Sequence, residues 1–338
     1  MSGATAGRRY RFLGLHLYIS GTVALLDALA PRFRYFSADE PQSPDLEFEF
    51  ITLDPGVSHA LTHPAGQGRR LAPPRDDGFE VAYYADDDVL YINYRDKVRA
   101  LCDARRSHVR VSIAAPEAEN LWAATRPVFV LSLFELLKRR GLFNVHASGA
   151  AIGDRVILLP GHSGAGKTTL AAALCRAGFA FMADDYVFLT RGPRGIRVRA
   201  FPEELEILNE TGSLIPEISR FLQTAPPSAV WKRQVRAEEC WQTTLRWEGS
   251  AAVLVFPTIA HALTSRIAPM EPGDALSHLV SNIQFTQPDL AQEHLDVFGA
   301  LVRACACYRL ETGRDLASVS AVLRGLLQSD ERVVDVRR

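Results

Sequence analysis

Gly161-His162-Ser163-Gly164-Ala165-Gly166-Lys167-Thr168 is the stretch that decides the fold of this chain, and it fits the pattern G-x-x-x-x-G-K-[ST] at every position. The apolar run 156–159 precedes it, and an Ala- and Leu-rich run over 169–177 follows it. The first run is typical of a buried strand and the second of a helix. This strand–loop–helix order is the context in which the pattern indicates a phosphate-binding loop.

The residue types of this loop explain how it would hold phosphate. Glycines let the backbone curl so that consecutive N–H groups point at phosphate oxygens, and the following helix presents its positive N-terminus to the same anion. We expect Lys167 to reach the β- and γ-phosphates of a nucleotide and the Thr168 hydroxyl to ligate Mg²⁺. The predicted nucleotide-binding segment therefore runs from Gly161 to Thr168 and includes Thr169 in the first turn of the helix.

The composition limits the class of protein. The 338 residues are 47% hydrophobic and 23% charged, which is typical of a globular chain with two domains, or with one large domain and an appendage. The net charge of −1 leaves no excess positive charge for a polyanion, so we expect no nucleic-acid partner. No run reaches the ~20 apolar residues that span a bilayer. We therefore expect a cytoplasmic protein with no membrane partner.

Three other patterns could signal chemistry, and each has a simpler interpretation. The five cysteines are odd in number and scattered, which favours buried structural thiols over disulfides or a metal site. His59 and His63 have the i, i+4 spacing of a zinc motif, but they lack the glutamate after the first histidine. The triplet Asp86-Asp87-Asp88 lies between two predicted strands and favours a hairpin turn over a cation site.

The chain divides into two parts at about residue 124. Residues 1–124 predict a smaller α+β domain, because short alternating runs typical of strands recur in it. Residues 125–338 carry the loop and begin with a helix over 127–140. That helix is apolar on most sides, so we expect it to be buried.

A hairpin is predicted immediately before the loop. Gly153-Asp154 separates the apolar runs 145–152 and 155–159, as a tight turn between two strands would. The strand that leads into the loop then has an antiparallel neighbour, whereas most phosphate-loop proteins have a parallel one there. His146 opens this hairpin, and by itself it reads either as a satisfied core histidine or as a residue that contacts phosphate or tunes an aspartate.

Two adjacent carboxylates follow the loop. Asp184 and Asp185 interrupt the apolar strand predicted at 179–188, after a length of chain that allows one short helix and a return strand. Burying two carboxylates is costly unless they are paired or bound to a metal. We therefore expect one to hold Mg²⁺, directly or through water, and the other to accept a proton from an attacking hydroxyl.

Together these residues resemble the catalytic domain of HPr kinase/phosphorylase. That family has H-A-S, then G-x-S-G-x-G-K-S, a short helix that ends near R-G, and A-D-D-x-V, in this order and at similar distances. The corresponding stretches here are His146-Ala147-Ser148, the loop, Arg176-Ala177-Gly178 and Ala183-Asp184-Asp185-Tyr186-Val187.

The resemblance implies an α/β fold: a mixed-sheet kinase domain akin to phosphoenolpyruvate carboxykinase, here preceded by the smaller α+β domain. It implies transfer of phosphate from ATP, or from a related donor, to a serine hydroxyl of a protein or peptide, with Mg²⁺ as cofactor. Carried over by position, Lys167 and Thr168 bind phosphate and metal. Asp184 is the candidate base, Asp185 its acidic partner on the metal side, and His146 a further site residue.

The chain departs from the classical enzyme in three respects. Leu205-Glu206-Ile207 matches only the start of the acidic L-E-I-R-G segment, so Glu206 is a weaker candidate for a metal ligand. The C-terminal phosphorylase signature is not evident, and the N-terminal part does not match. These departures indicate a divergent serine kinase, for which a peptide natural-product precursor is one acceptor to consider.

Two functions of other classes stay open at this point. One is a nucleotide-binding regulatory module without phosphate transfer, and the other is an NTPase switch that acts on a partner protein. The intact aspartate pair favours the kinase, because nucleotide binding alone needs no base. The sequence leaves open the identity of the acceptor and whether the protein is a homo-oligomer.

Overall fold

The computed structural model divides the chain into two compact units, Met1–Leu142 with Gln284–Glu293, and Phe143–Ile283 with His294–Arg338. Each unit contains a mixed sheet, and the protein is of the mixed α/β class. Uncertain placement leaves these residues out of the description: 1–4, 38–41, 54–63, 65–67, 72–78, 87, 115–117, 194, 223–232, 282, 284–285 and 336–338. His59, His63 and Asp87 thus lie outside the described residues.

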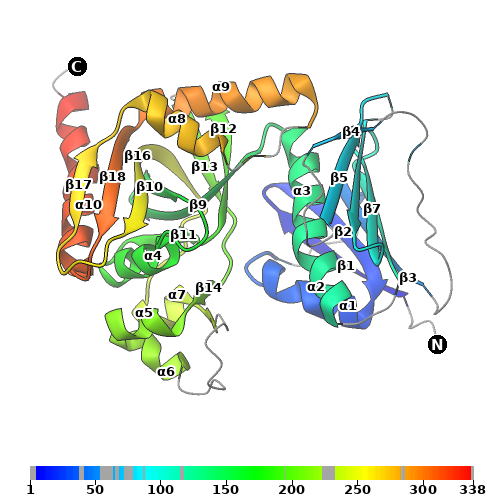
Figure 1. Cartoon of the computed structure of the whole chain (residues 1–338), viewed down its shortest axis with the longest axis horizontal. Coiled ribbons are helices and arrows are strands. Elements are labelled where there is room, and N and C mark those ends of the chain that lie inside the picture. The colour runs from blue at the N-terminus through cyan, green and yellow to red at the C-terminus, as the bar shows by residue number, and fades with distance from the viewer. Residues whose placement is uncertain are drawn as a thin grey trace. The chain divides into compact units, whose positions relative to one another are not determined.

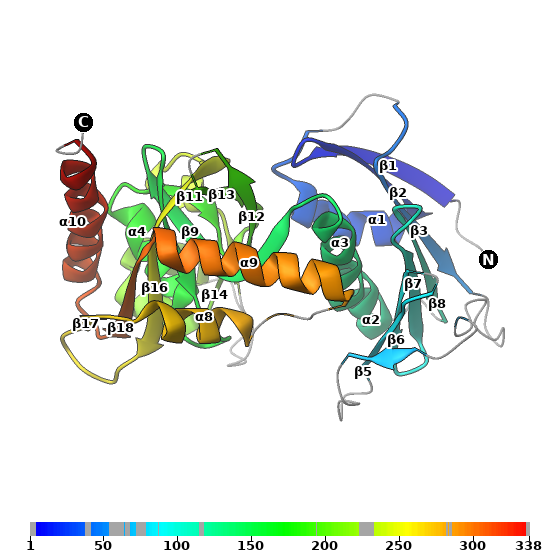
Figure 2. The same ribbon diagram turned by 90° about the horizontal axis from the view of Figure 1, so that it is seen from above.

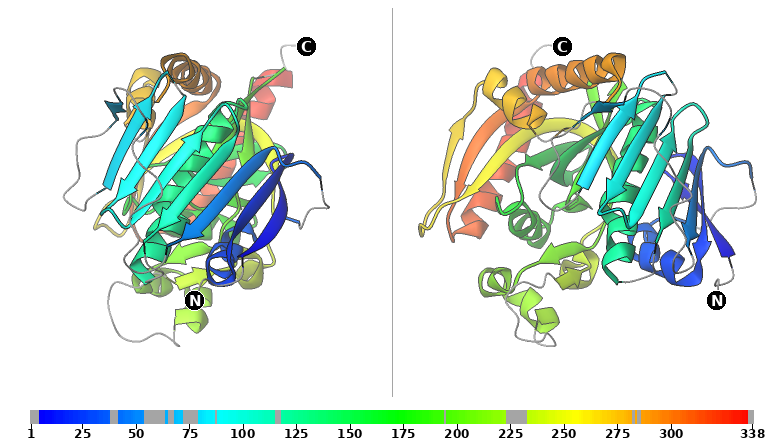
Figure 3. Two further views of the ribbon diagram at one scale, coloured as in Figure 1. Left: turned by 90° about the vertical axis from the view of Figure 1, so that its right-hand side faces the viewer. Right: turned by 45° about the vertical axis from the view of Figure 1, so that its right-hand side comes forward.

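The first unit contains an eight-stranded sheet with helices α1 (Val23–Leu29), α2 (Ala118–Ala123) and α3 (Phe129–Lys138) on one face (Figures 1 and 2). Strands β2, β3 and β8 are parallel to one another, and the other neighbours are antiparallel. Figure 3 shows this sheet from two further sides. Its strand order is β1 (Thr5–Phe12), β2 (Leu15–Thr22), β3 (Leu46–Thr52), β8 (His108–Ile113), β7 (Val98–Asp103), β6 (Val89–Tyr94), β5 (Phe79–Tyr84), β4 (Arg69–Arg70).

Helix α3 belongs to the first unit, whereas the division drawn from the sequence places it after the boundary at residue 124. The ring of Phe129 lies 5.8 Å from that of Phe33 and 4.7 Å from that of Phe48, so the helix buries its apolar face on this sheet. Hydropathy showed that the helix is buried, but not which sheet covers it. The helical segment also begins earlier than 127, because α2 and a π-helical turn (Ala124–Val128) that contains Pro127 precede α3.

The second unit is built on the strand that leads into the Gly161–Thr168 loop, β10 (Arg155–Pro160). It pairs antiparallel with β9 (Phe143–Ile152), as the predicted hairpin requires, and parallel with β16 (Glu248–Ile259). The pairings β10–β9, β9–β12, β12–β13, β13–β16 and β16–β10 close into a ring of five strands. Two of the ring strands are β12 (Tyr186–Gly192) and β13 (Gly195–Ala200). The strands of this sheet that lie outside the ring are β11 (Ala180–Ala183), β17 (Arg266–Pro269) and β18 (Ala306–Thr312).

The alternation of side chains along β10 divides the apolar core of this unit in two. Ile157 and Leu159 pack in a cluster with α4 (Lys167–Arg176) and α10 (Leu316–Asp335). Val156 and Leu158 pack in another cluster with α8 (Pro272–Val280) and the second half of α9 (Pro288–Ala304). Strand β10 is therefore buried from both sides, which explains its uninterrupted apolar run.

A small lobe adjoins α4 in Figure 1. Its apolar side chains, among them Leu205, Ile215 and Val235, join the same cluster as α4. The lobe consists of β14 (Leu205–Ile207), α5 (Asn209–Leu214), η3 (Pro216–Ile218), α6 (Ser219–Leu222), β15 (Arg233–Val235) and α7 (Ala237–Trp241).

Two further findings concern the cysteines and the helices. All five cysteines are free, and only Cys240 is partly exposed. In the part of the chain that the structure describes, no helix is long and apolar enough to cross a membrane.

Asp154, in the turn between β9 and β10, is held by three side chains: Arg197 from β13, Ser250 from β16, and Arg246 from the segment that precedes β16. Its carboxylate accepts hydrogen bonds from Arg197 (2.7 Å), Ser250 (2.7 Å) and Arg246 (3.0 Å). The hydrogen bond from Arg197 is the main reason why the pKa of Asp154 falls to about 2. The carboxylate thus ties the turn to β13 and β16.

We predict that Asp154→Asn lowers the free energy of unfolding by about 1 kcal/mol at pH 7, because charge-assisted hydrogen bonds are lost from a half-exposed site. The folded pKa lies below that of the unfolded chain, so this contribution is present above pH 4 and is lost as the pH falls toward 2. Urea unfolding at pH 7 and at pH 3 measures it. Asp274→Asn is the matched control, since both side chains of the Asp274–Arg309 pair are 58% exposed. An equal loss in both variants, or a loss that does not depend on pH, would contradict the prediction.

Candidate active site

The Gly161–Thr168 loop turns from β10 into α4 through two glycines with left-handed backbone angles. Gly164 has φ 83° and Gly166 has φ 91°, a region that side-chain-bearing residues rarely adopt. A Cβ atom at Gly161 would lie 3.2 Å from the Cβ of Ala165, which shows how tightly the loop closes. The loop therefore has the compact curl that the motif predicts.

Lys167 folds back across this loop. Its Nζ donates hydrogen bonds to the carbonyl oxygens of Gly161 (2.9 Å) and His162 (3.0 Å), and the side chain is buried. His162 and Ser163, at the tip of the loop, are exposed. The ammonium group thus lies inside the curl that would surround a phosphate.

Asp184 lies in the bend between β11 and β12, which both pair with β9. Its Oδ2 accepts hydrogen bonds from the Thr168 hydroxyl and from the backbone N–H of Glu206, both at 3.1 Å. The Ser148 hydroxyl lies 2.5 Å from the Asp184 carbonyl oxygen and 3.2 Å from Oδ1. The residue is only 2% exposed, so this carboxyl group is a buried link between the loop, β9 and β14.

Burial raises the pKa of Asp184 to about 7, and the charge of Asp185 adds to this shift. The hydrogen bonds from Glu206, Thr168 and Ser148 act in the opposite direction because they stabilise the carboxylate. A carboxyl group in this state changes its charge near neutral pH. A cation bound beside it would favour the ionised form.

Asp185 and His146 form an accessible pair beside this buried group. The Nε2 atom of His146 lies 3.8 Å from Oδ1 of Asp185, and the Asp185 side chain is 38% exposed. The backbone N–H of Ala147 donates to the Asp185 carbonyl oxygen (3.0 Å), and the ring of Tyr186 lies 5.3 Å from that of His146. The two adjacent aspartates therefore have different environments: Asp184 is buried, whereas the Asp185 side chain is accessible from outside.

Two other expected residues contribute in ways that the sequence did not indicate. Glu206 reaches Asp184 through its backbone N–H, whereas its side chain was the expected metal ligand. The hydroxyl of Thr169 lies 3.1 Å from that of Thr211 on α5, so it connects α4 to the small lobe. Ser148 has no role that the sequence predicted, although its position two residues after His146 on β9 places both side chains on one side of the strand.

The donor set suits Mg²⁺ bound to a nucleotide. Among the described residues, no three His, Cys, Asp or Glu side chains are grouped so that they could hold a metal ion. Mg²⁺ usually takes one or two carboxylates and completes its shell with phosphates and water. Thr168 and Asp184, with Asp185 next along the chain, are compatible with such a partial set.

The fold and the site thus define a mixed α/β protein in which a tightly curled glycine-rich loop adjoins a buried aspartate. No family model and no curated protein matches the sequence. Among solved structures, the Hpr(Ser) kinase/phosphatase from Coxiella burnetii is similar over 57% of this chain and 98% of that chain, with 9% sequence identity and a TM-score of 0.31. This likeness is weak and distant, so the function proposed below depends on the geometry of the site.

We predict that Asp184→Asn stabilises the metal-free protein at pH 8 by an amount on the order of 2 kcal/mol. The folded pKa of about 7 lies above the unfolded value, so wild type loses stability as the pH rises from about 4 to 7, because the buried group must ionise. Asparagine keeps an oxygen for Thr168 and Glu206 and stays neutral. Urea unfolding in a chelator from pH 5 to 8 measures the difference.

Asp185→Asn is the matched control for this measurement, because that side chain is partly exposed. We expect its unfolding free energy to follow the wild-type dependence on pH much more closely. A wild-type stability that is flat from pH 5 to 8, or an Asp184→Asn variant that is less stable at pH 8, would contradict the buried-acid interpretation.

Proposed function

We propose that this protein is a Mg²⁺-dependent kinase that transfers the γ-phosphate of ATP, or of a related donor, to the serine hydroxyl of a protein or peptide. The observation that carries the proposal is the 3.1 Å hydrogen bond from Thr168 to Asp184. It joins the hydroxyl that the loop would offer to a metal ion to a buried carboxyl group. An accessible carboxylate and a histidine lie directly beside that group.

The residues of the loop would bind the donor. Backbone N–H groups and the N-terminus of α4 suit the phosphates, and Lys167 would exchange its contacts with two loop carbonyls for phosphate oxygens. Thr168 and Asp184 would hold Mg²⁺, which supplies charge neutralisation across the β- and γ-phosphates. Ionisation of Asp184 beside the metal would then cost less than in the metal-free protein.

The open half of the site suits the acceptor. Asp184 is enclosed by three hydrogen-bond donors, whereas Asp185 is exposed enough to meet a hydroxyl group. We therefore assign proton acceptance to Asp185, with His146 positioned to orient it, and metal binding to Asp184. The family resemblance implies the reverse assignment, with Asp184 as the base and Asp185 on the metal side. As the acceptor oxygen bonds to the γ-phosphorus and the bond to the leaving nucleoside diphosphate breaks, the hydroxyl proton passes to Asp185.

We predict that Lys167→Ala, Asp184→Asn and Asp185→Asn each lower phosphate transfer by about 10²- to 10⁴-fold, because each removes charge stabilisation or proton acceptance. Incubation with γ-labelled ATP, Mg²⁺ and a panel of serine-containing peptides and phosphocarrier proteins measures the label transferred. Only Lys167→Ala and Asp184→Asn should also weaken binding of Mg²⁺–ATP, since Asp185 is assigned to the acceptor.

The surface variant Asp274→Asn is the control and should keep full activity. Equal label transfer by all variants would disprove the kinase proposal. Release of inorganic phosphate without a labelled acceptor would instead indicate an NTPase switch, and binding of ATP without turnover would indicate a regulatory module.

A further inference from the structure

We propose that Ile259, at the end of β16, is the apolar platform on which the nucleoside of the donor rests, and that it separates nucleotides from simple polyphosphates. The inference rests on the proposed function, since it concerns the donor of that same site.

Strand β16 rises past the start of the loop. It runs parallel to β10 with Leu158 opposite Leu254, so the two strands end at the same edge of the sheet. β10 ends at Pro160, two residues beyond this pair, and β16 continues to Ile259, five residues beyond it. The extra three residues extend roughly 10 Å at the usual rise of a strand. The end of β16 therefore forms a wall beside the loop.

Ile259 is the side chain of this wall that meets the loop. A Cβ atom built on Gly166 would lie 3.3 Å from Cγ1 of Ile259 and 3.8 Å from its Cδ1. Gly166 directly precedes α4, where the phosphates would bind. Yet Ile259 is 57% exposed, so the contact leaves most of an apolar side chain facing outward next to a site for a charged ligand.

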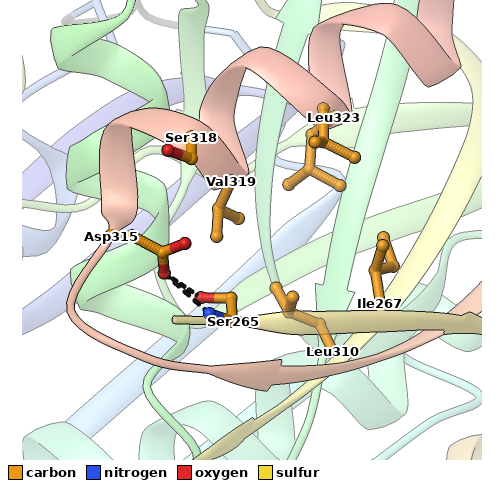
Figure 4. Close-up of a pocket in the computed structure, with 8 residues that line it drawn as sticks. Ser265, Ile267, Leu310, Asp315, Ser318, Val319 and Leu323 are labelled. Atoms are coloured by element: carbon orange, nitrogen blue, oxygen red, sulfur yellow. Dashed lines mark hydrogen bonds between the residues drawn. The ribbon is translucent and has the colours of Figure 1, made fainter. Parts of the chain in front are cut away.

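The backbone around Ile259 is held in place by β18 and the start of α10. Ile259 pairs with Thr312, and the N–H of Ala260 donates to the Thr312 carbonyl oxygen (2.9 Å). Further along, the N–H and the hydroxyl of Ser265 both donate to Asp315 at the start of α10 (Figure 4). A platform fixed in this way would lose little conformational entropy when a ligand covers it.

The two flanks of the loop explain why a nucleoside is the occupant. β10 lies between β9, whose other edge brings in Asp184, and β16, which carries Ile259. With the metal-binding end of a triphosphate directed toward Asp184, the nucleoside at the other end of the phosphate chain would lie on the side of β16. Bases and ribose bind mainly through apolar surface, whereas phosphates need charge and N–H donors. The end of β16 offers apolar surface, through the exposed side chain of Ile259.

The test compares binding of Mg²⁺–ATP and of Mg²⁺–tripolyphosphate by calorimetry. We expect Ile259→Ser to weaken ATP binding by about three- to tenfold, in line with the loss of a partly covered aliphatic side chain, and to leave tripolyphosphate binding unchanged. Ile259→Phe keeps the apolar surface and should bind ATP at least as well as wild type. Val322→Ser, an exposed β-branched residue on α10, is the matched control and should bind both ligands normally.

Three outcomes would overturn the platform. ATP binding by Ile259→Ser equal to wild type would mean that Ile259 does not touch the nucleoside. Equal weakening of both ligands would mean that Ile259 acts through the shape of the loop at Gly166. If wild-type protein binds neither ligand, the proposed function fails and the platform fails with it. A loss confined to ATP supports the platform even if no acceptor for phosphate transfer is found.

Discussion

Strand β9 is hydrogen-bonded to β10 along one edge and to β11 and β12 along the other, and the candidate site depends on this pairing. The strand places the loop after β10 next to the bend between β11 and β12, which carries the two aspartates. It also supplies His146 and Ser148 from its own residues. Moving β9 by one residue would turn its side chains to the opposite face and remove both from the site.

The buried carboxyl groups of the two units are stabilised in different ways. In the first unit, Glu135 is almost fully buried, but Arg139 lies 2.9 Å and Lys138 3.6 Å from its oxygens, and the hydroxyl of Thr286 donates to it. In the second unit, Asp184 has neutral hydrogen-bond donors and an acidic neighbour. The side chains of Arg139 and Lys138 supply positive charge beside Glu135. In the proposed function, a bound cation would supply it beside Asp184. Glu135 is thus part of a buried ion network, whereas Asp184 is the carboxyl group to which the proposed function assigns a bound cation.

In the proposed function, the free-energy cost of ionising the buried Asp184 is linked to ligand binding. A buried aspartate with a raised pKa destabilises the metal-free protein near neutral pH, and its hydrogen bonds offset only part of that cost. Binding of Mg²⁺ and a nucleotide would remove the cost, so occupancy of the site and stability of the second unit are linked. The loop follows β10 of the five-stranded ring, and the two aspartates precede β12 of the same ring.

The sequence by itself determined the features that depend on neighbouring residues. The loop, the β9–β10 hairpin, the length of α4 and its end at Gly178 all follow from local turn chemistry and periodicity, and the structure contains each of them. The length of chain between Lys167 and the aspartates, enough for one short helix and a return strand, also predicted that the aspartates can come back to the loop.

Only the tertiary structure decided the environment of each of those residues. The family resemblance gave Asp184 and Asp185 different roles, but only the structure shows that Asp184 is buried and that the Asp185 side chain is partly exposed. Glu206 contributes a backbone N–H, which no residue type can reveal. The unit to which α3 belongs and the contact of Ile259 with Gly166 depend on packing between segments far apart in the chain. Hydropathy shows that a surface is buried, whereas only the fold shows which surface buries it.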